Sequence, residues 1–194
     1  MKCKPVGGVF GIAVVTLIVA LISPRSSAQS SSVTASRSRA KPLLLEKNEG
    51  EHRVWRDPPP GGFTLKVSPK NNGSQHLVFG TEDIAPGDEI PTHKHLGQDE
   101  IVFIERGTLH VDLGDQKRDL HTGGLVFIPA YTWVHLKNAG TETASIVFVF
   151  SAPGFENLLR CESVPAGEKP TPTTEAEREK CDELGHVFYK DGPN

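Results

Sequence analysis

The feature that most constrains the fold is a series of short β-rich segments between residues 63 and 152, separated by Gly, Pro, Asp and Asn. β-branched and aromatic residues favour strands, whereas the separating residues favour turns. We expect strands at 63–67, 75–84, 89–95, 100–105, 108–113, 117–120, 125–128, 133–138 and 145–150. Many short strands without helical periodicity predict an all-β sandwich, jelly roll or barrel.

The N-terminal segment predicts export. Lys2 and Lys4 precede an uncharged, mostly apolar run at 9–22, and a small-x-small site ends at Ala28. This pattern is typical of a secretory signal peptide, which we place at 1–28. A membrane anchor is the alternative, but the run is shorter than the ~20 residues that a spanning helix needs. We therefore expect a secreted or periplasmic protein with no stable membrane anchor after cleavage.

The segments on either side of 63–152 have a different composition. Residues 29–62 are rich in small and charged residues and end in a Pro- and Gly-rich stretch, which predicts a flexible leader. Residues 153–194 form a C-terminal tail, in which a capping-box pattern at Thr174 and Glu177 predicts a short helix. The whole chain has 194 residues and a formal net charge of −3. This length predicts one folded domain, and the missing basic excess argues against nucleic-acid binding.

Two of the three cysteines, Cys161 and Cys181, would remain after cleavage of the signal peptide. Because exported proteins meet an oxidising environment, we expect these two to form a disulfide, with two unpaired thiols as the alternative. The predicted tail helix carries few apolar residues, so a covalent link would help to hold it. In the chain-entropy model, closing a loop of this length stabilises by roughly 3 kcal/mol.

Three residues form the strongest pattern for chemistry. His93 and His95 are two positions apart, so a strand would place both imidazoles on one face. Glu100 follows after a turn that contains Gly97 and begins the next predicted strand. Two imidazoles and one carboxylate on a rigid sheet predict a site for one divalent transition metal such as Fe, Mn, Zn or Ni.

With Gly87 and Gly107 on either side, this stretch resembles the first cupin motif, G-x5-H-x-H-x(3,4)-E-x6-G, at every position. The resemblance covers roughly residues 63–152. It implies a cupin-type antiparallel β-barrel of the jelly-roll type, with the two histidines and the glutamate as metal ligands. Cupins include dioxygenases, isomerases, decarboxylases and ligand-binding modules, so the resemblance does not choose a function.

The second cupin motif, G-x5-P-x-G-x2-H-x3-N, is degenerate here. Tyr131 replaces the motif glycine, Val134 takes the place of the ligand histidine, and His135 comes one residue late. Since side chains alternate along a strand, we expect Val134 to point inward and His135 outward, although a β-bulge could turn His135 back. The main expectation is a three-ligand metal site with open positions. A relic that has lost its metal is the alternative.

Four residues near these motifs are candidates for the ligand pocket. Tyr131 and Trp133 would lie near a barrel end, where they could line the mouth or pack against the flanking segments. Gln98 could bind a ligand or be an ordinary turn residue, and Val134 would face the barrel interior.

The leading functional hypothesis is an exported metalloenzyme that acts on or binds a small organic molecule, with dioxygenase-like chemistry as one option. The alternative is a non-catalytic cupin that binds a sugar or phenolic ligand with a reduced or lost metal site. A third hypothesis is an interaction protein in which leader and tail mediate dimerisation, and a homodimer is compatible with all three.

Overall fold

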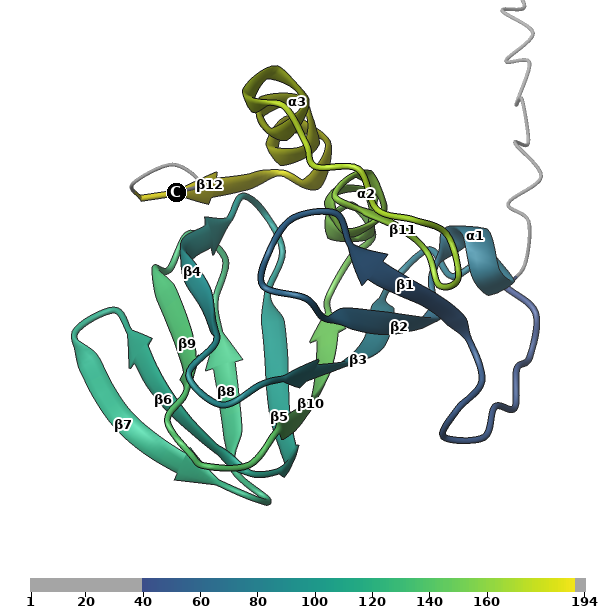
Figure 1. Ribbon diagram of the computed structural model, residues 1–194. Coiled ribbons are helices and arrows are strands. Elements are labelled where there is room, and N and C mark those ends of the chain that lie inside the picture. Colours follow the sequence, from purple (N-terminus) through teal and green to yellow (C-terminus); the bar gives the residue numbers. More distant parts are fainter. Residues whose placement is uncertain (1–39, 191–194) are drawn as a thin grey trace, which may run out of the picture. The chain divides into compact units, whose positions relative to one another are not determined.

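The computed structural model describes residues 40–190, which form two antiparallel sheets and three short helices (Figure 1). The predicted signal peptide lies outside these residues. No helix within 40–190 is long and apolar enough to cross a membrane.

The first sheet has seven strands and the second has five, with all neighbouring pairs antiparallel. The order in the first sheet is β11 (Ser163–Pro165), β1 (Glu51–Trp55), β2 (Gly62–Val67), β3 (Val78–Ile84), β10 (Ala144–Phe150), β5 (Glu100–Arg106) and β8 (Leu125–Ile128). The order in the second is β12 (Val187–Tyr189), β4 (Glu89–His95), β9 (Val134–Asn138), β6 (Thr108–Leu113) and β7 (Gln116–His121). The helices are α1 (Pro69–Asn72), α2 (Phe155–Cys161) and α3 (Glu175–Gly185).

The main core lies between the two sheets because every second residue of a strand points to the same face, so inward-facing apolar residues of both sheets meet. In β5, Val102 and Ile104 are fully buried, whereas their neighbours Ile101 and Phe103 face outward. Buried residues of both sheets form one cluster: Ile84, Val102, Ile104, Leu109, Val111, Val126, Ile128, Val134, Leu136, Ala144 and Ile146. The predicted all-β fold of cupin type is therefore confirmed.

A second core cluster joins one end of the first sheet to α2. Phe148 and Phe150 of β10 pack with Phe155 and Leu158 of α2, and Val187 of β12 belongs to the same cluster. Helices α2 and α3 lie together at this end of the sheets (Figure 1). The tail is thus packed onto the barrel rather than standing apart from it.

The predicted flexible leader is wrong for Glu51–Trp55, which forms β1. This strand pairs with β2, where Arg53 lies opposite Phe63, and with β11 on its other side. Of its two partners, β2 follows closely in the sequence whereas β11 is distant, and the composition of 29–62 alone did not indicate a strand.

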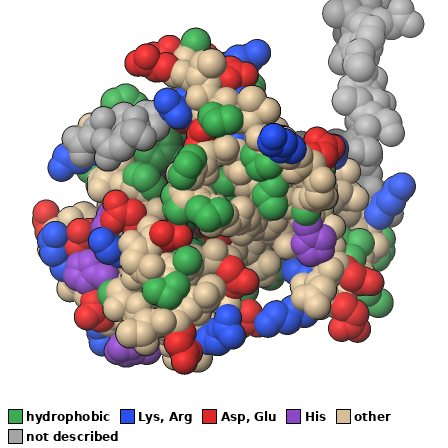
Figure 2. Space-filling view, viewed as in Figure 1, with side chains coloured by type: hydrophobic (Ala, Val, Ile, Leu, Met, Phe, Trp, Pro, Cys, Tyr) green, Lys and Arg blue, Asp and Glu red, His purple; other side chains and the backbone are tan. Residues whose placement is uncertain are grey.

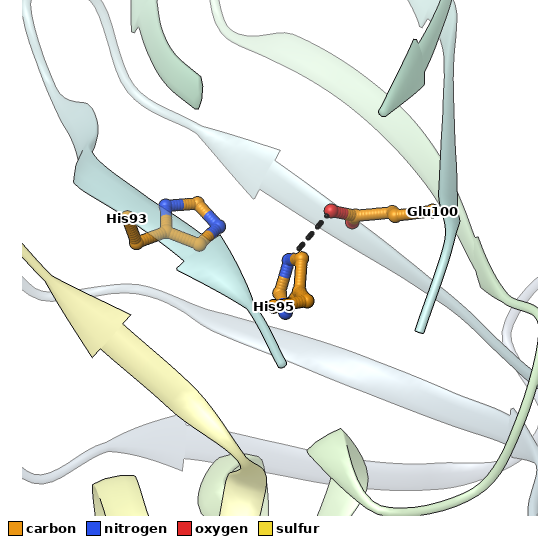
Figure 3. A group of neighbouring side chains, drawn as sticks. All are labelled: His93, His95 and Glu100. Atoms are coloured by element: carbon orange, nitrogen blue, oxygen red, sulfur yellow. Dashed lines mark hydrogen bonds and ion pairs between the residues drawn. The ribbon is translucent and has the colours of Figure 1, made fainter. Parts of the chain in front are cut away.

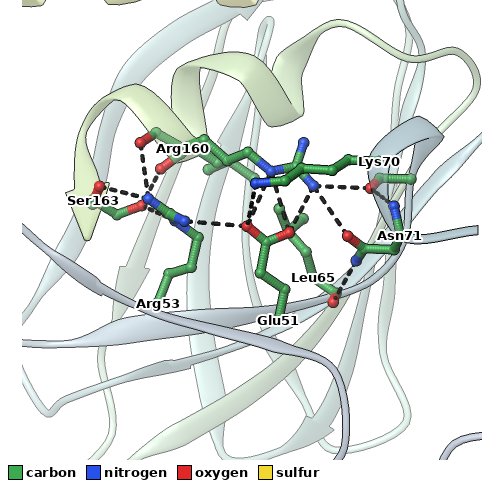
Figure 4. A network of polar contacts seen from close by, with 9 residues as sticks. Glu51, Arg53, Leu65, Lys70, Asn71, Arg160 and Ser163 are labelled. Carbon is green, nitrogen blue, oxygen red and sulfur yellow. Dashed lines mark hydrogen bonds and ion pairs between the residues drawn. The ribbon is translucent and has the colours of Figure 1, made fainter. Parts of the chain in front are cut away.

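Buried polar contacts hold β1 against α2 and the residues around α1 (Figure 4). Arg160 donates hydrogen bonds to the Glu51 carboxylate at 2.7 Å and to the Ser68 hydroxyl at 2.9 Å. Arg53 donates to the carbonyl oxygen of Ser163 at 2.7 Å. Although burial alone would raise it, the hydrogen bond and positive charge of Arg160 hold the pKa of Glu51 below its usual value.

A disulfide links the two tail helices. Cys161 at the end of α2 and Cys181 in α3 are bonded, with Cα atoms 5.5 Å apart, as the sequence predicted. Helix α3 also begins with the predicted capping box between Thr174 and Glu177. Because β12 follows α3 directly, the disulfide helps to fix where this strand pairs.

Candidate metal centre

Strand β4 carries both histidines on its buried face. His93 and His95 are 3% and 1% exposed, as expected for residues two positions apart on a strand. Strand β12 of the tail lies beside them, with Tyr189 opposite His93 and Val187 opposite His95. The C-terminal tail therefore completes the sheet around the ligand-bearing strand.

Glu100 brings a carboxylate from the first sheet to the two imidazoles. It is the first residue of β5 and is buried. One potential ligand atom from each of the three side chains lies within 4.8 Å of the other two (Figure 3). The Nε2 atom of His95 is 3.0 Å from a carboxylate oxygen of Glu100. This arrangement brings together the three residues that the sequence predicted.

The environment of each imidazole defines which nitrogen can bind a metal. The Nδ1 atom of His93 is 2.7 Å from the carbonyl oxygen of Pro91; if it donates to this acceptor, Nε2 is left as the ligand atom. The ring of His95 is held by edge contacts with Phe150 and Phe155, at centroid distances of 5.0 and 4.6 Å. The Nδ1 atom of His95 is buried and has no partner within residues 40–190.

His93 is in the neutral form that metals require. Burial, together with the nearby His95, lowers the pKa of His93 to about 3. The ring therefore does not carry a proton on both nitrogens at neutral pH. A neutral His93 imidazole beside the Glu100 carboxylate fits a divalent transition metal.

The position of the usual fourth ligand offers no donor. Val134 of β9 lies opposite His93 and is buried in the core between the sheets. His135 points to the outer face, where its Nε2 atom is 3.3 Å from Glu89. The strand-alternation argument is confirmed, and no bulge turns His135 inward.

The candidate metal site opens on a cavity of about 650 Å³. His93 and Glu100 form part of its wall, together with aromatic side chains of β10 and α2. A glycine at position 80 of β3 leaves room for the ring of Phe148 in this wall, because a Cβ at Gly80 would lie 2.2 Å from that ring. Hydrophobic side chains gather near the centre of the face in Figure 2, with acidic side chains among them.

Residues outside the predicted barrel complete the cavity. The Trp55 side chain and the loop at 56–61 line it from the predicted leader, and Arg178 and Tyr189 line it from the tail. Sequence analysis missed these contributions because nothing local to either segment indicates which part of the barrel it covers.

Sequence analysis also missed Glu82. This residue lies on the same face of β3 as the buried Val78, Gly80 and Ile84, so its side chain points inward and lines the cavity. The indole N–H of Trp55 donates to its carboxylate at 3.3 Å. Burial, reinforced by the negative charge of Glu100, raises the pKa of Glu82 to about 7. The sequence does contain one indication of Glu82, since it is an acidic residue at a position where the strand alternation predicts an inward-facing side chain.

The four predicted pocket residues lie elsewhere. The amide nitrogen of Gln98 donates to the carbonyl oxygen of Pro153 at 2.8 Å, and Tyr131 is 65% exposed. Trp133 lies under the ammonium of Lys94, 4.6 Å from the ring centroid. Val134, described above, belongs to the core. None of the four lines the cavity, so proximity to the motifs in sequence was a poor guide to the ligand pocket.

Comparisons with known proteins agree with this fold. Residues 80–150 match the family model of the cupin domain. Protein SchB of Streptomyces halstedii is 30% identical over 88 residues, which cover 45% of this chain and 64% of SchB. Polyketide synthase CurC of Streptomyces cyaneus is 26% identical over 113 residues, which cover 58% of this chain and 71% of CurC. The chain thus spans about two thirds of these curated relatives.

Solved structures show the same architecture. The crystal structure of a predicted oxalate decarboxylase from Thermotoga maritima superposes with a TM-score of 0.51 at 16% identity. The match covers 57% of this chain and 100% of the other one. At this identity the likeness shows the fold alone.

Proposed function

Because the chain belongs to the cupin superfamily through its domain at 80–150, we propose that it is a metal-dependent enzyme acting on a small organic molecule. The observation that carries this proposal is a group of three buried donor residues that opens on a cavity of about 650 Å³. A purely structural metal site is usually closed by four protein ligands, and Val134 supplies none at the fourth position.

The three residues His93, His95 and Glu100 would hold the metal. A bound divalent metal such as Fe, Mn, Zn or Ni would supply Lewis-acid polarisation of a substrate oxygen. The chain itself orients His93 through Pro91 and holds His95 between two phenylalanine rings. These contacts fix the ligand atoms before any metal or substrate binds, which reduces the cost of ordering the site.

Dioxygenase-like chemistry is the finer form of this proposal. Two histidines and one carboxylate with open positions suit non-haem Fe(II). The apolar, aromatic wall of the cavity favours a carbon-rich substrate over a small polar one. The similarity to CurC, which is named as a polyketide synthase, is consistent with a substrate of that kind.

The alternative is a protein that binds a small ligand without turnover. Val134 at the usual ligand position and the unpaired Nδ1 of His95 favour this alternative. In both cases we propose export, because the Cys161–Cys181 disulfide suits an oxidising compartment.

The test is metal-dependent conversion of a bound compound. The protein, loaded in turn with Fe(II), Mn(II), Ni(II) or Zn(II), is incubated with a panel of phenolic and sugar compounds under air. Oxygen uptake and product masses are followed for the wild type and for His93→Ala. Conversion by the wild type but not by the variant supports the enzyme. Binding without conversion in every metal form contradicts it and favours the binding protein.

A further inference from the structure

Glu82 places a further carboxylate in the cavity wall, in addition to the three candidate metal ligands. Its carboxylate accepts one hydrogen bond, from the indole of Trp55 at 3.3 Å. No ion pair neutralises Glu82 within residues 40–190, and its side chain lines the cavity. A carboxylate kept in an apolar cavity without a counter-ion is costly unless it has a partner to bind.

The cavity as a whole carries an excess of acidic groups. Seven acidic and two cationic side chains line it. Both cations are already paired, since Lys137 lies 3.5 Å from Glu89 and Arg178 lies 3.5 Å from Asp57. Among the residues that the structure describes, the cavity therefore offers no free cation to an anionic ligand. A ligand with its own negative charge would meet repulsion from Glu82.

The walls around Glu82 are aromatic. Trp55 and Phe148 line the cavity, and so do Phe150 and Phe155, whose ring centroids are 4.6 Å apart. Such walls suit a flat apolar ring, which can pack against several aromatic faces and edges at once. A hydroxyl is an uncharged donor that complements a carboxylate acceptor.

We propose that the cavity binds an uncharged aromatic molecule with a hydroxyl group, and that Glu82 accepts the hydrogen bond from this hydroxyl. The inference rests on the proposed function, because it names the class of molecule on which the metal site would act. Glu82 is then a substrate-binding residue, and Trp55 positions it.

The experiment compares two probes that share one ring system. Binding of 2-naphthol and of 2-naphthoate is measured by titration calorimetry at pH 8, with the metal content of every sample recorded. The wild type is expected to bind 2-naphthol about tenfold more tightly than 2-naphthoate, or better, because only the naphthoate is charged. Equal or tighter binding of 2-naphthoate by the wild type overturns the proposal, whatever the variants do.

Glu82→Gln removes the charge while keeping an acceptor oxygen. In this variant the affinities for 2-naphthol and 2-naphthoate are expected to differ by no more than about threefold, mainly because 2-naphthoate binds better than it does to the wild type. Glu142→Gln is the matched control, since Glu142 is exposed, lies outside the cavity wall and loses the same charge. An unchanged preference in folded Glu82→Gln, or an equal change in the control, overturns the role of Glu82.

The same samples separate this inference from the proposed function. Protein that prefers 2-naphthol but converts no compound in any metal form contradicts the metal-dependent enzyme and leaves the binding class intact. Metal-loaded protein without the preference contradicts the binding class alone. If Glu82→Gln does not fold, Trp55→Phe replaces it, since losing the indole donor at 3.3 Å should lower the affinity for 2-naphthol by about threefold.

Discussion

Removing the disulfide between Cys161 and Cys181 should lower the free energy of unfolding by a calculable amount. The bond closes a loop with a sequence separation of 20. With that loop length, the chain-entropy relation gives about 11 cal/mol/K, which is about 3 kcal/mol at 25 °C. The double variant Cys161→Ala/Cys181→Ala should therefore lose about this much, while a domain of ordinary stability stays folded.

Urea unfolding followed by circular dichroism measures this loss. Wild-type protein treated with a thiol reductant should show the same shift as the double variant, because both remove the same loop constraint. Strand β12 follows α3 and pairs with the strand that carries His93 and His95, so the freed tail should also weaken metal binding. A loss below about 1 kcal/mol, with metal binding unchanged, would refute the reasoning.

Three further predictions concern other parts of the fold. Val134→His should place a third imidazole, and thus a fourth ligand, opposite His93 and tighten Zn(II) binding about tenfold, measured by competition with a chelator. The lowered pKa of Glu51 means that its pairing with Arg160 stabilises above pH ~4.5 and is lost as pH falls through the folded value. Glu51→Gln should therefore cost about 1–3 kcal/mol at pH 7 in urea unfolding, and progressively less as the pH falls below 4.5. The outward apolar side chains of β5 and of the end strand β8 predict a homodimer, which Phe127→Lys should convert to monomer in sedimentation velocity.

The parts of the fold that depend on local alternation could be predicted from the sequence. The spacing of His93 and His95 fixed their common face, and the pairing of β4 with β9 placed Val134 inward and His135 outward. The predicted strands at 108–113 and 117–120 also pair as β6 and β7, and Gly114 between them has the positive φ that such a tight turn requires. Each of these features needs only the two-residue period of a strand and the chemistry of a turn.

The parts that depend on long-range pairing could not be predicted in this way. Strand β1 was assigned to a flexible leader because its partners, β2 and β11, are not visible in its own composition. Tyr131 was expected at a ligand pocket, yet it occupies a turn with φ of 64° and faces solvent. The cavity is instead lined in part by Trp55 and Tyr189 from the two flanking segments. Tertiary contacts between distant segments therefore decide where a ligand can bind.

The most direct test of the account is the metal content of protein purified without a histidine tag. The wild type and His135→Ala should each hold about one equivalent of a transition metal, whereas His93→Ala should hold almost none. Each variant removes one imidazole, but His135 comes one residue after the position of the usual fourth ligand and faces outward. Thermal unfolding shows whether the two variants are equally stable. Wild-type protein that takes up no Fe(II), Mn(II), Ni(II) or Zn(II), or an equal loss in both variants, would contradict the account.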